Sequence, residues 1–246
     1  MSAPTLLVVA HGSRDPRHAA TVQALVRRAG ALRPGLRVET AFLDFTLPSV
    51  PGVLDRLAAD GVREVVALPL LLTRAFHAKA DIPAVLRGAP AGLRVRQAEV
   101  LGPSPLLLAA VERRLYEAGL APGDKSSTGV VLASAGSSDP EAIAVIAETA
   151  RELRRTGWCS VRPAFASASL PRTDEAVRAL RAEPRVRRVA VAPYVIAPGR
   201  LPDRIAAGAA DADVLADVLG PAPELARLLL ERYEDATADR LAAVAG

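Results

Sequence analysis

Residues Thr5–Pro16 read TLLVVAHGSRDP, and this stretch decides the fold that the rest of the chain is expected to adopt. Its first part, Thr5–Ala10, is a short, continuous apolar run, which is typical of a strand buried on both faces of a parallel sheet. The run stops at His11. Asp15 followed by Pro16 is typical of a helix start, because Asp accepts hydrogen bonds from free amides and Pro fits the first helical position. Open α/β sheets bind ligands at such turns, where the carboxyl end of a strand leads into a helix.

The first half of the chain continues this alternation of strands and helices. Strand-like apolar runs at Leu36–Phe42, Glu64–Leu72 and Leu93–Ala98 are separated by helical patterns. Alternation at this spacing indicates βαβ units with a parallel sheet and right-handed crossovers. The polar, turn-rich stretch Pro122–Ser127 is the best candidate for a linker between two halves.

The second half repeats the first half. The turn His11–Pro16 (HGSRDP) returns as Ala135–Pro140 (AGSSDP), shifted by 124 positions. Further matches follow in the same order and at nearly the same spacing, which indicates a duplicated unit. The sequence therefore predicts an α/β fold of two tandem copies, each a small parallel four-stranded sheet flanked by helices. The predicted domains are residues 1–122 and residues 123–246, the second being a degenerate repeat that lacks the histidines.

The first copy carries ionisable residues at three turn positions where the second copy has none. These positions are His11, Asp44 and His77, which align with Ala135, about Ser167 and about Leu201. If the ionisable side chains served only the fold, some of them would be expected in both copies. The asymmetry predicts one site per chain, in the first copy, formed by His11, Asp44 and His77.

These three side chains favour a site for a transition metal ion. Two neutral imidazoles and a carboxylate suit a borderline divalent ion such as Fe²⁺, Co²⁺ or Ni²⁺. A structural zinc site more often has four protein ligands. Because both histidines follow strands of one parallel sheet, their rings are expected to face each other across one cleft.

Other polar residues near these turns have simpler interpretations. His18 falls in the first turn of the predicted helix, and we expect it on the solvated face. Asp15, Asp81 and Asp139 precede helices and are typical N-caps. The cations that flank the histidine turns are candidates for anion binding; they are Arg14, Arg74 and Lys79.

Composition excludes several classes of function. Aromatic residues make up only 3% of the chain, which argues against stacking platforms for single-stranded nucleic acid. The net charge of +4 comes mostly from arginine and favours anionic partners. A single cysteine, Cys159, excludes an internal disulfide framework. The apolar run near the amino terminus is too short for a signal peptide or a membrane span, so we expect a cytoplasmic protein with no membrane partner.

Three segments together resemble a known family. They read AHGSRDP after the first strand, AFLDFTLPS after the second and LPLLLTRAFHAKADIP after the third. This combination resembles the CbiX/SirB group of sirohydrochlorin chelatases, which belong to the class II chelatases. The resemblance covers nearly the whole chain, because long members of that group are two tandem copies with the catalytic histidines in the first.

The resemblance implies insertion of a divalent metal ion into sirohydrochlorin without ATP, in sirohaem or cobalamin synthesis. The metal would be Fe²⁺ or Co²⁺, with Ni²⁺ as a third candidate, and would be a substrate, so no tightly bound cofactor is expected. His11 and His77 match the family's two catalytic histidines. Asp44 stands where the family often has glutamate and completes the expected metal-binding set.

The resemblance also implies a partner rich in carboxylates, since sirohydrochlorin carries many of them. The second copy would cover the other side of the macrocycle, and the chain is expected to be a monomer or a weak homo-oligomer. Candidate substrate-binding residues are Ser13, Arg14, Arg74, Lys79 and Arg200.

Two other functions remain open from the sequence. A non-catalytic carrier would bind metal and tetrapyrrole without joining them. A phosphoryl-transfer enzyme would use His11 as nucleophile, but phosphatases with a His-Gly at a strand end have Arg before the histidine, where this chain has Ala10.

Overall fold

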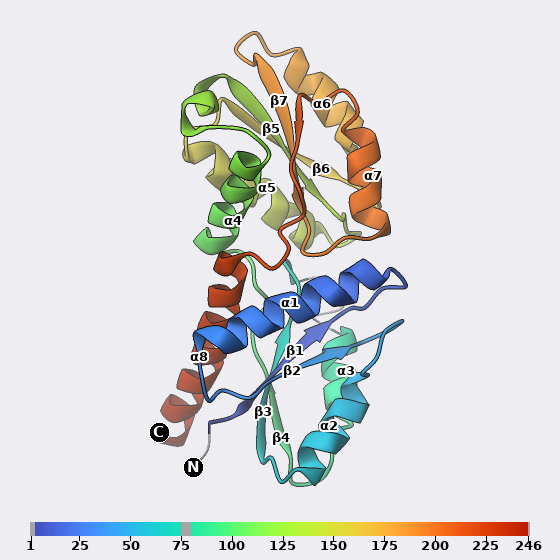
Figure 1. The fold of residues 1–246 in the computed structure, drawn as a ribbon, viewed down its shortest axis with the longest axis vertical. Coiled ribbons are helices and arrows are strands. Elements are labelled where there is room, and N and C mark those ends of the chain that lie inside the picture. Colours follow the sequence, from blue (N-terminus) through green and yellow to red (C-terminus); the bar gives the residue numbers. More distant parts are fainter. Residues whose placement is uncertain (1–2, 75–79, 246) are drawn as a thin grey trace. The chain divides into compact units, whose positions relative to one another are not determined.

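A computed structural model describes residues 3–74 and 80–245 of the chain (Figure 1). The chain forms two compact units, one made of Met1–Gly102 and Pro221–Gly246 and the other of Pro103–Gly220. Each unit contains one parallel four-stranded sheet flanked by helices, which confirms the predicted fold class. Among the described helices, none is both long enough and apolar enough to cross a membrane.

The sheet of the first unit has the strand order β2-β1-β3-β4, with β1 at its centre. Every residue of β1 is buried, as expected for a strand covered on both faces. The strands are β1 (Thr5–Ala10), β2 (Val38–Phe42), β3 (Glu64–Pro69) and β4 (Arg94–Gln97). One face is covered by α1 (Pro16–Leu32) and α8 (Pro223–Ala245), and the other by α2 (Val50–Ala59) and α3 (Ile82–Leu86) (Figure 1).

The sheet of the second unit repeats this order as β6-β5-β7-β8. Its strands are β5 (Thr128–Ser134), β6 (Ser160–Phe165), β7 (Arg188–Tyr194) and β8 (Val214–Leu215). One face is covered by α4 (Pro105–Glu117) and α5 (Pro140–Arg155), and the other by α6 (Thr173–Arg181) and α7 (Arg200–Gly208). The stretch Pro122–Ser127, predicted as a linker between halves, forms a 3₁₀ helix and belongs to the second compact unit.

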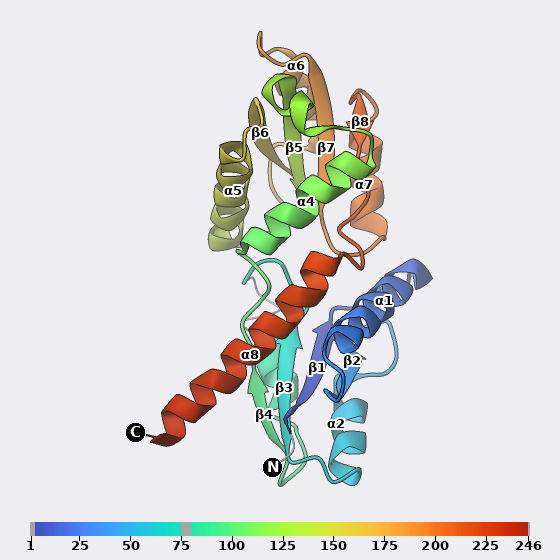
Figure 2. The same ribbon diagram turned by 60° about the vertical axis from the view of Figure 1, so that its left-hand side comes forward.

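The compact units differ from the predicted domains 1–122 and 123–246, because two helices are exchanged. Helix α4 follows β4 in the sequence but packs on α5 and β7 of the second unit. Helix α8 ends the second repeat but packs on α1 and β3 of the first unit (Figures 1 and 2). An apolar helix face shows that a helix is covered, not which sheet covers it, so the sequence pattern could not distinguish the two arrangements.

Helix α8 is held on the first unit by apolar burial and by specific hydrogen bonds. The Tyr233 hydroxyl donates to the Pro4 carbonyl oxygen at 2.8 Å. The Arg232 guanidinium donates to the carbonyl oxygens of Val100 and Leu101 at 2.9 and 3.0 Å. Among the α8 side chains that the structure describes, the large ones that are almost completely buried are Leu225, Leu228, Leu229 and Tyr233.

A fragment of residues 1–122 is therefore expected not to fold as a stable monomer. It lacks α8, and each large buried side chain of that helix contributes about 1.5–3 kcal/mol, a total comparable with the stability of a whole domain. Circular dichroism during denaturation, with light scattering after size-exclusion chromatography, tests this expectation against the full chain. A monomeric fragment that unfolds as cooperatively as the full chain would show that α8 is dispensable.

Candidate functional site

The turn between β1 and α1 packs directly against the turn that follows β2. Gly12 has a φ of +96°, and a Cβ at this position would lie 1.8 Å from the Asp44 carbonyl oxygen. Only glycine fits both the positive φ and the close approach of the Asp44 carbonyl, since it adopts positive φ without penalty and has no Cβ. The Asp44 N–H donates to the His11 carbonyl oxygen at 2.9 Å. The two turns thus bring His11 next to Asp44 at the carboxyl edge of the sheet.

A second set of hydrogen bonds joins the same two turns. The Thr46 hydroxyl donates to the Ser13 carbonyl oxygen at 2.9 Å and accepts from the Ser13 N–H at 3.3 Å. The Ser13 hydroxyl accepts from the Asp15 N–H at 3.1 Å. In this structure Ser13 therefore stabilises the turn, and its contact with a substrate stays a prediction.

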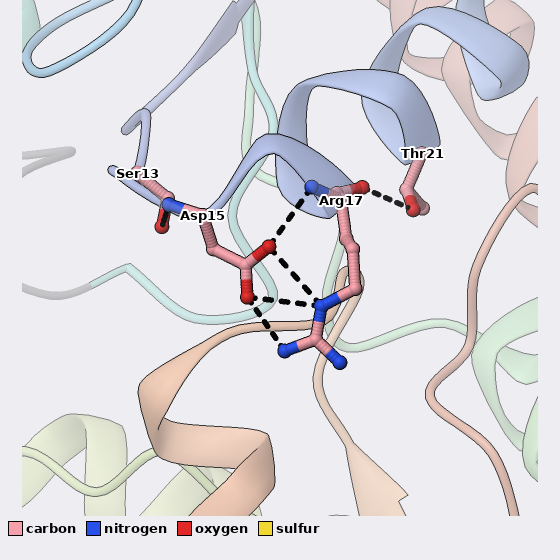
Figure 3. Close-up of polar contacts among 4 residues, drawn as sticks. All are labelled: Ser13, Asp15, Arg17 and Thr21. Carbon is pink, nitrogen blue, oxygen red and sulfur yellow. Dashed lines mark hydrogen bonds and ion pairs between the residues drawn. The ribbon is translucent and has the colours of Figure 1, made fainter.

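The start of α1 is built around Asp15 (Figure 3). Its Oδ1 accepts from the Arg17 N–H at 2.9 Å, and the Arg17 guanidinium donates to both carboxylate oxygens, at 2.6 Å in the shortest contact. This guanidinium lowers the pKa of Asp15 below its ordinary value. The predicted N-cap role of Asp15 is confirmed, as is that of Asp139, which accepts from the Glu141 N–H at 3.0 Å.

The third predicted cap differs from the other two. Asp81 occupies the N-cap position of α3, but within the described residues its side chain makes no capping hydrogen bond. Its backbone already has helical dihedral angles, φ −69° and ψ −48°, whereas a capping residue is normally extended. The expectation of a capping carboxylate at Asp81 is therefore wrong.

His11 is exposed and lies among a small group of side chains at this edge. Its ring centroid is 6.2 Å from that of Phe45, and the two rings meet edge to face at 74°. The guanidinium carbon of Arg14 lies 4.8 Å from the centroid of the Phe45 ring. The Asp44 Oδ1 accepts a hydrogen bond from the Phe45 N–H at 2.8 Å. The structure thus places three of the candidate residues, His11, Asp44 and Arg14, next to Phe45, which the sequence analysis did not single out.

His18 is not on the solvated face of α1, where the sequence analysis placed it. It is half-buried, its ring centroid lies 6.3 Å from that of Phe42, and its buried Nδ1 has no hydrogen-bond partner among the described residues. Burial lowers the pKa of His18, and the charge of His11 lowers it further. The sequence contains a signal for the partial burial of His18, because this residue precedes the buried Val22 by one helical turn and lies on the same helix face.

The remaining predicted residues lie outside the described part of the chain or have other surroundings within it. His77 and Lys79 lie outside the described residues. The exposed Arg74 pairs with Glu99 at 3.6 Å, and the exposed Arg200 begins α7 in the other unit. Within residues 3–74 and 80–245, no group of three or more His, Cys, Asp or Glu could hold a metal ion. The metal set that includes His77 therefore stays a prediction.

The second unit contains the same pair of turns without the same side chains. A Cβ on Gly136 would lie 1.9 Å from the Ser167 carbonyl oxygen, and the Ser167 N–H donates to the Ala135 carbonyl oxygen at 3.0 Å. The Ser169 hydroxyl donates to the Ser137 carbonyl oxygen at 2.6 Å, as Thr46 does to Ser13. The backbone is thus reproduced without an imidazole or a carboxylate. The residues at the positions of His11, Arg14, Asp44 and Phe45 are Ala135, Ser138, Ser167 and Ala168.

Comparison with known proteins shows to which family the chain belongs. The family model described as CbiX matches residues 5–118 and residues 129–236, which are the two repeats. The chain belongs to the CbiX family. The resemblance seen in the sequence is thereby confirmed.

Two curated relatives of this CbiX family member are named as sirohydrochlorin chelatases. The sequence is 28% identical to the sirohydrochlorin cobaltochelatase of Priestia megaterium, over 94% of this chain and 79% of that protein. It is also 28% identical to the sirohydrochlorin ferrochelatase of the same organism, over 81% of this chain and 76% of that protein. Among solved structures, SirB from Bacillus subtilis with Fe³⁺ superposes with a TM-score of 0.83 at 24% identity, covering 98% of each chain. This superposition shows that the CbiX family member shares the SirB fold.

Proposed function

We propose that this chain is a sirohydrochlorin chelatase, which inserts a divalent metal ion into sirohydrochlorin without ATP. The observation that carries the proposal is the exposed His11, which stands on a turn whose second copy has the same backbone and an alanine. The curated relatives named above, a cobaltochelatase and a ferrochelatase, support the substrate. The ion is Fe²⁺ or Co²⁺, with Ni²⁺ also compatible with imidazole ligands, and it is consumed as a substrate.

The reaction joins the metal ion to four ring nitrogens and releases two protons from the pyrrole N–H groups. His11 and His77 hold the incoming ion on one face of the macrocycle through neutral imidazole nitrogens. An imidazole binds metal only when it is neutral and accepts a proton near pH 7, so the same side chains serve delivery of the metal and removal of the protons.

Asp44 has a supporting role in this proposal. Its Oδ1 is held by the Phe45 N–H at 2.8 Å, which gives the carboxylate a defined position beside the His11 turn. A carboxylate at this place orients an imidazole or relays a proton to solvent, as carboxylates next to metal-binding histidines do. The carboxylates of the macrocycle pair with cations at the edge of the site, for which the candidates are Arg14, Arg74, Lys79 and Arg200.

The test is an anaerobic spectrophotometric assay of metal insertion with Fe²⁺, Co²⁺ and Ni²⁺ in parallel. The full chain is expected to accelerate the change from the metal-free to the metallated absorption spectrum with at least one of the first two ions. Binding of both substrates without acceleration would identify a carrier instead. Hydrolysis of a generic aryl phosphate, with no insertion, would identify a phosphoryl-transfer enzyme.

A further inference from the structure

Phe45 is an exposed aromatic residue in a strained conformation. The residue is 52% exposed, and its φ of +59° lies in the left-handed region, which a bulky residue rarely adopts. Glycine or asparagine would suit this backbone better. Residues held in this region cluster at functional sites, which makes the matching position of the second unit a useful comparison.

The second unit shows that the turn does not need the phenyl ring. Ala168 occupies the same place with a φ of +61°, between Ser167 and Ser169, which make the same turn-to-turn hydrogen bonds as their counterparts. The left-handed conformation therefore belongs to the turn, whereas the ring is particular to the first repeat. Phe45 thus joins His11, Arg14 and Asp44 as a residue that only the first repeat has at this edge.

The Phe45 ring lies close to both an imidazole and a cation. The His11 ring meets it edge to face at a centroid distance of 6.2 Å, and Arg14 lies over it at 4.8 Å. A guanidinium that stacks through its face keeps its N–H edge able to pair with a carboxylate. An apolar ring, an imidazole and a guanidinium side by side match a planar, carbon-rich molecule that carries carboxylates at its rim.

We propose that Phe45 is a substrate-binding residue whose ring packs against the face of the tetrapyrrole, while Arg14 pairs with one of its carboxylates. The proposal rests on the proposed function and names the contact that holds the macrocycle beside His11. Packing against the substrate removes exposed apolar surface of both partners from water. Phe45 therefore contributes to the affinity for sirohydrochlorin and not to the affinity for the metal.

The test compares Phe45→Ala with the wild-type full chain. The variant copies Ala168 at the matching position, so the fold is expected to be retained, and thermal unfolding checks this. The dissociation constant for sirohydrochlorin, from absorbance titration without metal, is expected to rise about tenfold, which corresponds to about 1.4 kcal/mol. The kcat at saturating sirohydrochlorin is expected to change by less than about threefold. Phe45→Tyr, which keeps the ring, is expected to bind as the wild type does.

Leu32→Ala is the matched control, because Leu32 is 50% exposed and ends α1, far along the helix from the His11 turn. It is expected to leave sirohydrochlorin binding unchanged. An unchanged dissociation constant in Phe45→Ala would overturn the inference. A fall of kcat with unchanged binding would also overturn it, because that result assigns the ring to positioning His11. A wild-type chain that neither binds sirohydrochlorin nor inserts metal would instead overturn the proposed function.

Discussion

Replacing His11 with alanine is expected to lower the rate of metal insertion by roughly a hundredfold or more, because a positioned proton acceptor alone contributes about 10²–10⁴-fold. The free energy of unfolding is expected to change by less than about 0.5 kcal/mol, as for other exposed residues. The second repeat supports this second expectation, since Ala135 occupies the same turn with the same backbone hydrogen bond to the neighbouring turn. Initial insertion rates and chemical denaturation of the same preparation measure both quantities.

The converse substitution provides the control. Ala135→His places an imidazole on the matching turn of the second unit, and in the His11→Ala background it is expected to restore no activity. His77→Ala is expected to match His11→Ala, and the double variant to be little worse than either, because groups that act together are not additive. Insertion at the wild-type rate by His11→Ala would remove this residue from the reaction.

Gly12→Ala is expected to abolish insertion and to destabilise the chain by about 3 kcal/mol or more. The positive φ alone costs roughly 1–2 kcal/mol for a residue with a Cβ. The new Cβ would also lie 1.8 Å from the Asp44 carbonyl oxygen, so the two turns must separate, and the His11 ring moves with them. Denaturation midpoints and insertion rates test the two parts of this expectation.

Substitutions at two other glycines separate the backbone strain from the steric clash as causes of the instability expected for Gly12→Ala. Gly119 has a φ of +98° with no atom within 4 Å of an added Cβ, so Gly119→Ala is expected to cost only the backbone strain, roughly 1–2 kcal/mol. Gly136→Ala meets the same clash as Gly12→Ala, at 1.9 Å from the Ser167 carbonyl oxygen, but in the second unit. It is expected to be as destabilising while the folded fraction keeps its insertion rate. Equal loss of activity in the two variants would place the second turn in the site as well.

Local features of the fold could be predicted from the sequence because short-range physics determines them. The apolar run Thr5–Ala10 is the buried β1, and Asp15-Pro16 begins α1, since a carboxylate next to free amides forms a cap wherever it occurs. The duplication was readable from the repeated turn, and both sheets have the same strand order. The exchange of α4 and α8 could not be predicted from the sequence, because an apolar helix face shows only that the helix is covered and not which sheet covers it.

The candidate site was predictable only where a residue carries obvious chemistry. His11 and Asp44 were proposed because an ionisable side chain missing from the second repeat stands out. Phe45 was missed, since a phenylalanine in a turn carries no chemical signal, although its alignment with Ala168 would have revealed the same asymmetry. The position of His18 was wrong because its polarity was weighed above its spacing from Val22.

The proposed mechanism requires that the imidazoles of His11 and His77, both in the first repeat, bind the same metal ion. X-ray absorption spectroscopy of the full chain loaded with Co²⁺ counts the imidazoles on the metal directly. Two imidazoles are expected for the wild type and one for each of His11→Ala and His77→Ala. The same imidazole count in all three proteins would contradict the account.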